Sequence, residues 1–394
     1  MAAERAKPER IRWRRALGCA HRAVEIFCCV LSASIWAGWQ WRAYKKAHRF
    51  DTLDQPSRLS TLVSEEAFYY SYYDDIVQNR GMSSIMFDSR SEHPDVINAL
   101  GRFNIYQEIW VGYLRNLLLR CGVVSAMEPF QFILVIIFAL SGLHLVGLML
   151  ISQRIAGKGL CGLFSTFAVA IWMGGMLIVS TRVWVLPEER ENWALPFLTM
   201  RTFFLVKHLS AAPPDVAVGN AHASLLSRHR SLIGSTVIFL LFWQFSPFVM
   251  LVQTMAMWCC FRMHTMSAHE LRQFLTADLF SYVTSMAILC GNTVYTTSFY
   301  LPFCVAVYSS SFLPPASLPI LWRPGAPTAL LCAVKRLLHF IFAGIAAAGV
   351  LLVVGAAVKI CSSTGLALIM SSNENGRVHN DVDDDHIFAL LKVT

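Results

Sequence analysis

The chain has 394 residues, of which 55% are hydrophobic and 15% are charged, and its formal net charge is +8. This composition is typical of a polytopic membrane protein and not of a soluble domain. Because the basic residues gather beside apolar segments, the positive charge indicates topology and contact with anionic membrane lipid, not nucleic-acid binding.

The apolar segments predict an all-α membrane protein with about eight or nine spanning helices, since one span needs about 20 mostly apolar residues and satisfies its backbone within itself. The expected spans are 23–41, 130–152, 160–181, 193–209, 231–244 with 247–261, 275–293, 299–313 and 337–360. The first is long, carries Glu25 and lacks a small-residue cleavage site after it. We therefore expect a retained anchor, not a cleaved signal.

The distribution of basic residues favours a cytosolic N-terminus, because arginines and lysines accumulate on the cytosolic side of membranes. Acidic loops then fall on the lumenal side. The expected organisation is a basic cytosolic tail over 1–22, a first transmembrane helix over 23–41, a first lumenal loop over 42–129, a multi-span bundle with short loops over 130–361 and a lumenal acidic tail over 362–394.

The first lumenal loop contains the stretch LVSEEAFYYSYYDDIV at 62–77, which places two adjacent carboxylates just ahead of four tyrosines. Helical spacing puts Glu65 on one face with Tyr69 and Tyr72, and Glu66 on another face with the remaining two tyrosines. A carboxylate beside an aromatic patch suggests a general base that meets an apolar or aromatic substrate. Tyr69 and Tyr72 are then candidate substrate contacts.

A structural interpretation of the same stretch stays open. Ser64 could cap a helix whose first two residues, Glu65 and Glu66, complement the helix dipole. The tyrosines could equally form part of an aromatic belt at the membrane surface.

The run INALGRFNIYQEIWVGYLRNLLLR at 97–120 predicts an amphipathic helix that lies on the membrane interface. Its apolar residues recur at helical spacing, and they include Trp110 and Tyr113, which suit the headgroup level.

The short loop RVWVLPEERENW at 182–193 places Arg182 and Arg190 among acidic residues and near tryptophans. One interpretation is a solvated loop whose charges pair with one another. The other is that an arginine binds a phosphate headgroup through its planar fork.

Trp243 and Gln244 precede Pro247 inside a long apolar stretch. They could form a membrane turn with aromatic anchors, or they could line a site for a sugar or an indole. The acidic run before His386 does not converge on one ion, and the eleven cysteines show neither zinc spacing nor a disulfide framework. We therefore expect no metal and no bound cofactor.

Five segments occur together in the order and spacing of one known family. They are SEEAFYYSYYDDIV (64–77), RFNIYQEIW (102–110), RENWALPF (190–197), FWQFSPFVMLVQ (242–253) and DDHIFALLK (384–392). At these residues the chain resembles the dumpy-19-like protein C-mannosyltransferases, membrane glycosyltransferases of the GT-C type. The second and third segments resemble most the third vertebrate paralogue.

The resemblance implies a multi-pass enzyme of the endoplasmic reticulum membrane. It would transfer mannose from the lipid-linked donor dolichyl-phosphate mannose to C2 of tryptophan in secretory proteins, in WxxW or thrombospondin-type sequences. The family's base is a glutamate of the first lumenal loop, which matches Glu65, with Glu66 as the alternative. Arg190 matches the arginine of the family's second-loop motif and is a candidate for binding the donor phosphate, with Arg182 a weaker one.

The sequence also departs from the family pattern. Family members continue well beyond the last matched segment, whereas this chain stops at Thr394, so we expect a C-terminally truncated form. Asp74 stands where the family usually has a lysine. The alternative function is therefore a catalytically inactive relative that acts as a membrane binding or scaffold protein. A transporter or channel is disfavoured, because the charged residues concentrate in loops.

Overall fold

A computed structural model of the chain describes residues 2–63, 65–124, 127–157, 162, 165, 168, 186–210 and 225–312. The described part is mostly helical and contains no strand, only one isolated antiparallel bridge between Asp88 and Ile97. The helices are α1 (Ala2–Ala47), η1 (Phe50–Thr52), α2 (Gln55–Leu59), α3 (Glu65–Val77), α4 (Ser83–Met86), α5 (Ala99–Arg102), α6 (Tyr106–Arg120), α7 (Pro129–Ala156), α10 (Arg190–Leu209), α11 (Leu225–Phe242), α12 (Ser246–Arg262), α13 (Ala268–Ile288), α14 (Thr293–Thr296) and α15 (Tyr300–Ser310).

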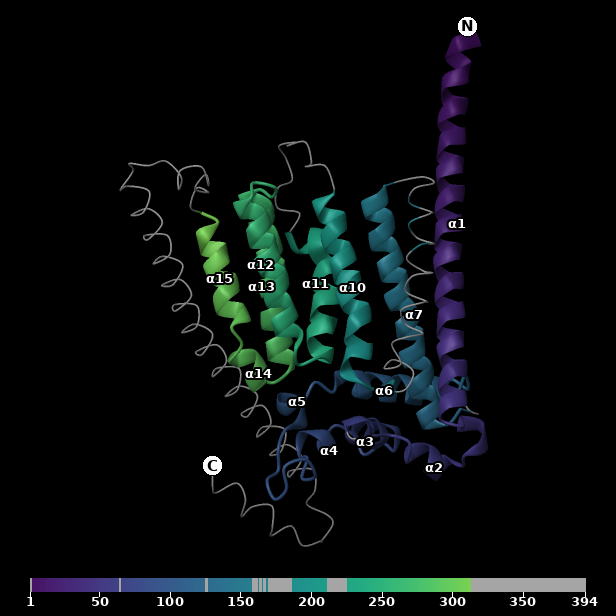
Figure 1. The fold of residues 1–394 in the computed structure, drawn as a ribbon, viewed down its shortest axis with the longest axis vertical. Helices are drawn as coiled ribbons and strands as arrows, with labels where there is room; N and C mark the ends of the chain where they lie inside the picture. The colour runs from purple at the N-terminus through teal and green to yellow at the C-terminus, as the bar shows by residue number, and fades with distance from the viewer. Residues whose placement is uncertain are drawn as a thin grey trace, which may run out of the picture.

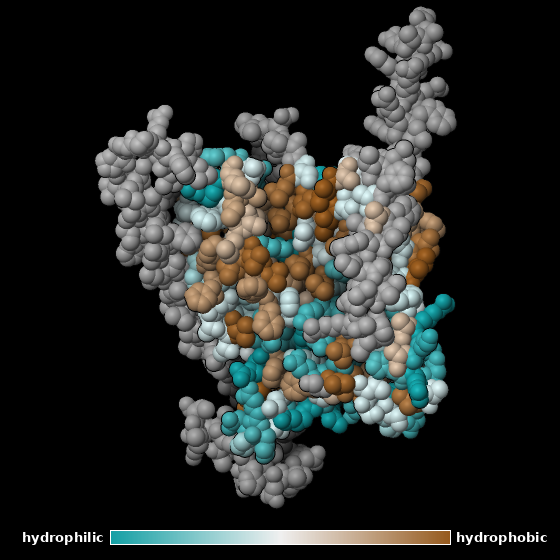
Figure 2. Space-filling model, in the orientation of Figure 1, coloured by the Kyte–Doolittle hydropathy of each residue, from teal (hydrophilic) through white to brown (hydrophobic). Residues whose placement is uncertain are grey.

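The helices form a bundle with a second layer across one of its ends. The helices α1, α7, α10 to α13 and α15 run side by side, and residues 50–124, which we call the loop layer, lie across the end of the bundle where α1 finishes (Figure 1). On the face shown in Figure 2, hydrophobic residues form a band over the bundle helices, and hydrophilic residues gather over the loop layer. This distribution agrees with the predicted bundle of helices in lipid.

The predicted spans overlap helices wherever the structure describes them, but α13 ends at Ile288, before the predicted bound of 293. Two of these helices, Ala23–Ala47 and Pro129–Ala156, are long and apolar enough to cross a membrane, and His229–Phe242 is a shorter apolar helix. The helix α1 also continues through the predicted basic tail, since it begins at Ala2. Span 337–360, the tail 362–394 and most of span 160–181 lie outside the described residues.

The predicted break between 231–244 and 247–261 is confirmed. The helix α11 ends at Phe242, and α12 begins at Ser246 with Pro247 in its first turn, where the missing N–H of proline costs no helical hydrogen bond. The turn between them therefore carries Trp243, Gln244 and Phe245.

The prediction of one continuous amphipathic helix over 97–120 is wrong in one respect. The run is divided into α5 and α6 because the backbone is extended at Phe103. Next to it, the Asn104 side chain donates hydrogen bonds to the carbonyls of Leu240 (2.9 Å) and Leu241 (3.1 Å) at the end of α11. The division thus lets an amide satisfy carbonyl groups of α11 that have no partner within their own helix.

The apolar residues of this run consequently divide between two surroundings. Leu100, Ile105 and Ile109 are buried in an apolar cluster with side chains of α3, whereas Trp110 and Tyr113 are exposed. The exposed residues continue along α6 at Leu114 and Leu117, which is the spacing of a single helix face.

Two glycines of α7 permit its close packing between α1 and α10. A Cβ at Gly142 would lie 2.9 Å from the carbonyl oxygen of Ala33 in α1, and a Cβ at Gly147 would lie 2.7 Å from the Thr199 hydroxyl in α10. Small residues at helix contacts allow this approach in membrane bundles.

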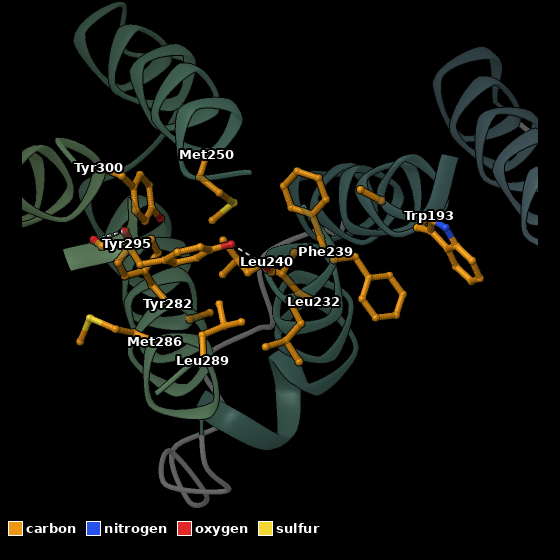
Figure 3. Packing of buried hydrophobic residues seen from close by; sticks show 14 of the residues in the cluster. Trp193, Leu232, Phe239, Leu240, Met250, Tyr282, Met286, Leu289, Tyr295 and Tyr300 are labelled. Carbon is orange, nitrogen blue, oxygen red and sulfur yellow. Dashed lines mark hydrogen bonds between the residues drawn. The ribbon is translucent and has the colours of Figure 1, made fainter. Parts of the chain in front are cut away.

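The core of the bundle is formed mainly by aromatic and long aliphatic side chains of α7, α11, α12, α13 and α15, and Figure 3 shows part of it. Tyr282 donates a hydrogen bond to the carbonyl of Tyr295 at 2.8 Å, and the hydroxyl of Tyr295 bonds the Leu240 carbonyl at the end of α11. These bonds satisfy buried hydroxyls that would otherwise be costly in a dry interior.

An ion pair joins three helices inside the bundle. Arg201 of α10 donates to Asp278 of α13 at 2.6 Å and to the side-chain oxygen of Gln253 in α12. Both charged side chains are only 1% exposed. Because each charge depends on the other for compensation, the pair fixes α10 against α13.

We expect Asp278→Ala to lower the free energy of unfolding by about 3–5 kcal/mol, because it leaves Arg201 buried, charged and unpaired. Replacing both partners, Arg201→Met with Asp278→Leu, should recover most of that loss. Unfolding of the purified protein in detergent measures both effects. Glu92→Ala is the control, since it breaks only an exposed pair with Arg102 and should cost less than about 1 kcal/mol. If Asp278→Ala were as stable as the wild type, the Arg201–Asp278 ion pair would not fix α10 against α13.

Candidate functional site

The candidate site lies where the loop layer meets the first turn of α10. Three segments contribute to it: the start of α3, the first turn of α6 and residues 186–190. The Asn192 side chain donates to the carbonyls of Leu186 (2.9 Å) and Pro187 (3.0 Å) and so folds the segment before α10 back onto the helix. This fold fixes the position of Arg190, the first residue of α10.

Arg190 is buried and held by two neighbours. Its Nη1 donates to both carboxylate oxygens of Glu108, at 2.8 and 2.9 Å. Its guanidinium carbon lies 3.2 Å from the centre of the Tyr69 ring, a cation–π contact. Burial raises the pKa of Glu108, and the adjacent Arg190 counteracts part of the rise.

The rest of the Arg190 guanidinium has donors to spare. Its Nε and Nη2 are buried and have no hydrogen-bond partner among the described residues. These two N–H groups point along one edge of a planar group, which is the arrangement that receives two oxygens of a phosphate or carboxylate. A buried donor pair without an acceptor is costly, so this edge is suited to an anion.

Glu66 connects the start of α3 to the segment that precedes α10. It is 3% exposed, and its two oxygens accept backbone hydrogen bonds from Val63 (3.2 Å) and Glu188 (3.3 Å). Glu66 thereby ties the segment before α10 to the start of α3. Burial raises the pKa of Glu66, and the two backbone N–H groups lower it in part.

Glu188 is a second buried carboxyl beside Glu66. Burial raises its pKa well above the ordinary value of 4.5, the negative charges of Glu66 and Glu108 raise it further, and Arg190 lowers it in part. One of its carboxyl oxygens has no hydrogen-bond partner in the described part of the chain. We therefore expect Glu188 to hold its proton more tightly than an ordinary glutamate does.

Glu65 differs from Glu66 in being exposed, as the first residue of α3. The capping interpretation needs Ser64, which lies outside the described residues. The two adjacent glutamates therefore have different surroundings: Glu66 is engaged by the backbone, and Glu65 is accessible.

The tyrosines of α3 confirm the predicted helix faces, but they do not form a belt at the membrane surface. Tyr69 and Tyr72 are buried in one apolar cluster with α5 and α6, and Tyr70 and Tyr73 are buried in the bundle core. Tyr70 packs edge-on against Phe130 at 5.5 Å. The belt interpretation is wrong because all four rings are covered by protein.

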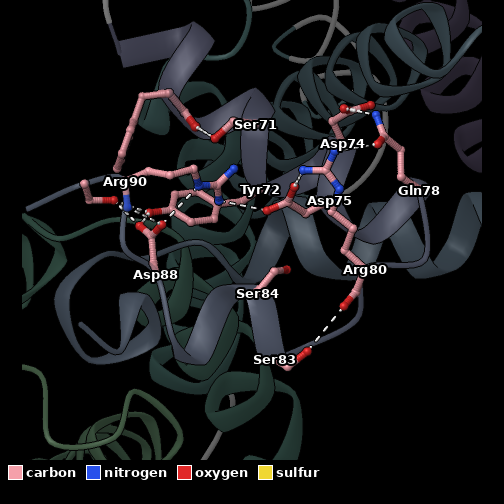
Figure 4. Close-up of polar contacts among 12 residues, drawn as sticks. Ser71, Tyr72, Asp74, Asp75, Gln78, Arg80, Ser83, Ser84, Asp88 and Arg90 are labelled. Carbon is pink, nitrogen blue, oxygen red and sulfur yellow. Dashed lines mark hydrogen bonds and ion pairs between the residues drawn. The ribbon is translucent and has the colours of Figure 1, made fainter. Parts of the chain in front are cut away.

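Tyr72 belongs to a polar network that fixes the chain after α3 (Figure 4). Its hydroxyl donates to Asp88 at 2.6 Å, and Arg90 bonds both Asp88 (3.1 Å) and Asp75 (2.8 Å). Burial raises the pKa of Asp88, but hydrogen bonds from Ser91, Tyr72 and Arg90 outweigh it and lower the pKa to about 2.

Trp243 and Gln244 lie in the turn after α11, and both are partly buried. Phe242, immediately before them, packs against Trp193 and Trp110 at ring distances of 6.5 and 5.4 Å. Phe242 thus places the start of this turn against the first turn of α10, which carries Arg190. Arg182 lies outside the described residues.

Sequence reasoning did not identify Glu108 and Glu188 as site residues. Glu108 lies inside the matched segment RFNIYQEIW, on the opposite side of α6 from its exposed apolar residues, and an acid on that side was the available signal. Glu188 was indistinguishable from the other acids of its loop.

Where the structure is described, no three His, Cys, Asp or Glu side chains are placed to hold a metal, and the expectation of no cofactor stays a prediction.

Comparison with known proteins places the chain among its relatives. The sequence model of the Dpy19 family, described as Q-cell neuroblast polarisation, matches residues 30–394. The Mus musculus protein C-mannosyl-transferase DPY19L1 is 27% identical over 334 residues, which cover 76% of this chain and 43% of that protein. The Caenorhabditis elegans C-mannosyltransferase dpy-19 is 23% identical over 359 residues, covering 84% and 46%. The chain thus spans less than half the length of these relatives.

We expect the unfolding temperature to fall as the pH rises above 4.5, the ordinary pKa of a glutamate. The folded state keeps the Glu188 proton at pH values where the unfolded chain has released it, so its stabilising effect is full below 4.5 and is lost as pH rises through the raised pKa. Glu188→Gln keeps the shape and cannot ionise, and it should remove part of the fall. Thermal unfolding of both proteins at a series of pH values above 4.5 measures the difference. If the unfolding temperature of Glu188→Gln fell equally steeply with pH, the pKa of Glu188 would not be raised in the folded state.

Proposed function

Because the chain belongs to the Dpy19 family, we propose that it is a C-mannosyltransferase acting on secretory proteins. It would transfer mannose from dolichyl-phosphate mannose to C2 of a tryptophan in a WxxW or thrombospondin-type sequence. Its relatives are named C-mannosyltransferases, which supports glycosyl transfer. The assignment to the third vertebrate paralogue stays a prediction.

The observation that carries the proposal is the unpaired edge of Arg190. Its Nε and Nη2 are buried, lack an acceptor among the described residues and belong to a residue already fixed through Nη1. We assign this edge to the phosphate of the lipid-linked donor. Two charge-assisted hydrogen bonds there would stabilise negative charge on the phosphate as it leaves the sugar.

We assign the general base to Glu65. A base needs access to the proton that it removes, and Glu65 is exposed. Glu66 is the weaker candidate, because both of its oxygens accept backbone hydrogen bonds that connect α3 to residue 188.

In the proposed transfer, Arg190 binds the leaving phosphate and Glu65 accepts the proton of the indole. The bond between mannose C1 and the phosphate oxygen breaks, and the phosphate takes the electron pair beside Arg190. Indole C2 forms the new carbon–carbon bond to C1 with inversion. Glu65 then removes the proton from C2 and restores the aromaticity of the indole. Since indole carbon is a weak nucleophile, stabilisation of the leaving phosphate is the larger demand.

Trp243 and Gln244 are our proposed contacts for the sugar or the indole. They lie in a turn at the end of the bundle that meets the loop layer. An aromatic face and an amide are suited to a sugar ring and to an indole. One face of the Tyr69 ring is occupied by the Arg190 guanidinium, and the predicted substrate contacts of Tyr69 and Tyr72 stay predictions.

We place the protein in the endoplasmic reticulum membrane as a multi-pass protein with the loop layer in the lumen. The N-terminus of α1 lies at the far end of the bundle from the loop layer (Figure 1). The basic residues at the end of α7 and of α10, Arg154 and Lys207, belong to helices that begin at the loop layer. A basic side opposite the loop layer agrees with a cytosolic surface.

We expect Glu65→Gln to reduce transfer by about 10²- to 10⁴-fold, the usual effect of losing a general base. The measurement is mass spectrometry of a co-expressed thrombospondin-type repeat, for a hexose on tryptophan, in cells without their own C-mannosyltransferases. Glu92→Gln, in an exposed ion pair of the loop layer, is the matched control and should leave transfer unchanged.

Two results would count against this assignment. Full activity of Glu65→Gln would exclude Glu65 as the base. No hexose with folded wild-type protein would favour the alternative, a relative that binds donor lipid or a partner without transfer.

We expect Arg190→Lys to raise the KM for the donor by about 10- to 100-fold, because lysine keeps the charge but cannot offer two N–H groups along one edge. Initial rates at varied donor concentration measure this effect. An unchanged KM would mean that the phosphate does not bind at the Arg190 edge.

A further inference from the structure

Glu108 makes an unusually restrictive contact with Arg190. Both of its oxygens accept from the same nitrogen, Nη1, at 2.8 and 2.9 Å. The side chains of Glu108 and Arg190 are 2% and 6% exposed, so water does not compete for the contact. The other two nitrogens of the guanidinium are left out of this bond.

We propose that Glu108 is a positioning residue, which holds Arg190 so that its Nε and Nη2 edge is presented to the phosphate of the lipid-linked substrate. This inference rests on the proposed function, because it assumes that Arg190 binds that phosphate.

The geometry restricts the guanidinium in two independent ways. Glu108 fixes the direction of Nη1, and the Tyr69 ring against the guanidinium face, 3.2 Å from its carbon, fixes the plane of the group. A planar group with one donor and its plane fixed has its opposite edge fixed as well. Arg190 therefore needs no reorientation when an anion arrives, and such preorganisation favours binding.

Glu108 can do this because α6 is itself firmly anchored. Gln107 donates to the Asn104 carbonyl at 3.0 Å, and Asn104 is bonded to the end of α11. On the same helix, a Cβ at Gly112 would lie 2.7 Å from the Ile76 side chain of α3, so the two helices are in close contact. A carboxylate on a rigid element is a better positioning group than one on a loop.

A different role for Glu108 would be to offset the charge of Arg190. In that case, loss of its negative charge would strengthen anion binding, and its exact reach would not matter. Two conservative substitutions separate these roles. Glu108→Asp keeps the charge but withdraws the carboxylate by one carbon–carbon bond, about 1.5 Å. Glu108→Gln keeps the reach and an acceptor oxygen but loses the charge.

The test is the binding of farnesyl phosphate to the purified full chain in detergent, measured by titration calorimetry, with farnesol as the probe that lacks phosphate. Positioning predicts that Glu108→Asp weakens binding about tenfold, as expected for one displaced charge-assisted bond. It predicts that Glu108→Gln binds within about threefold of wild type. The matched controls Glu92→Asp and Glu92→Gln, on an exposed ion pair of the same layer, should not change binding.

The alternative outcomes are distinguishable. Wild-type binding by Glu108→Asp, or binding tighter than wild type by Glu108→Gln, overturns the positioning role. If wild type does not bind the phosphate, or if Arg190→Gln binds it equally well, the proposed function fails as well.

A second pair of variants tests the same idea should Glu108→Asp not fold. Tyr69→Leu removes the ring beneath the guanidinium and leaves both charges in place, whereas Tyr69→Phe keeps the ring. Positioning predicts weaker farnesyl phosphate binding for the first and unchanged binding for the second, and equal binding by both would overturn it.

Discussion

The contact between Arg190 and Glu108 is the interaction on which the rest of the site depends. It joins the first turn of α10 to the first turn of α6, two segments 82 residues apart in sequence. A buried ion pair contributes little net stability compared with apolar packing, but it is costly to break. Its effect is therefore to specify one arrangement of the loop layer on the bundle, and that arrangement brings Glu65 and Arg190 to the same end of the molecule.

The helix α10 carries a buried ion pair at two levels. Arg190 pairs with the loop layer at its start, and Arg201 pairs with Asp278 inside the bundle, about 16 Å further along the axis at 1.5 Å per residue. The Arg201–Asp278 pair holds α10 against α13. The Arg190–Glu108 pair holds the start of the same helix against the loop layer. Preorganised charge of this kind is what departure of a phosphate requires.

The acidic surroundings of Arg190 have a further consequence. Glu108 and Glu188 are buried beside Arg190, and Glu66 is buried beside Glu188. Burial and the negative charges of Glu66 and Glu108 raise the pKa of Glu188, which favours its uncharged form. Glu66 and Glu108 can then use their oxygens to hold the backbone and Arg190.

The amino-acid sequence alone determined the helical class, the break before Pro247, the helix at 65–77 and the two faces of its tyrosines, because these follow from composition and from the local periodicity of the chain. The family resemblance identified Glu65 and Arg190 as candidate residues. Only the tertiary structure decided that Glu66 accepts backbone hydrogen bonds while Glu65 is exposed, that 97–120 is divided at Phe103, and that Glu108 holds Arg190. These facts depend on contacts between segments far apart in sequence, and local spacing carries no information about which distant side chain or carbonyl will complete a hydrogen bond.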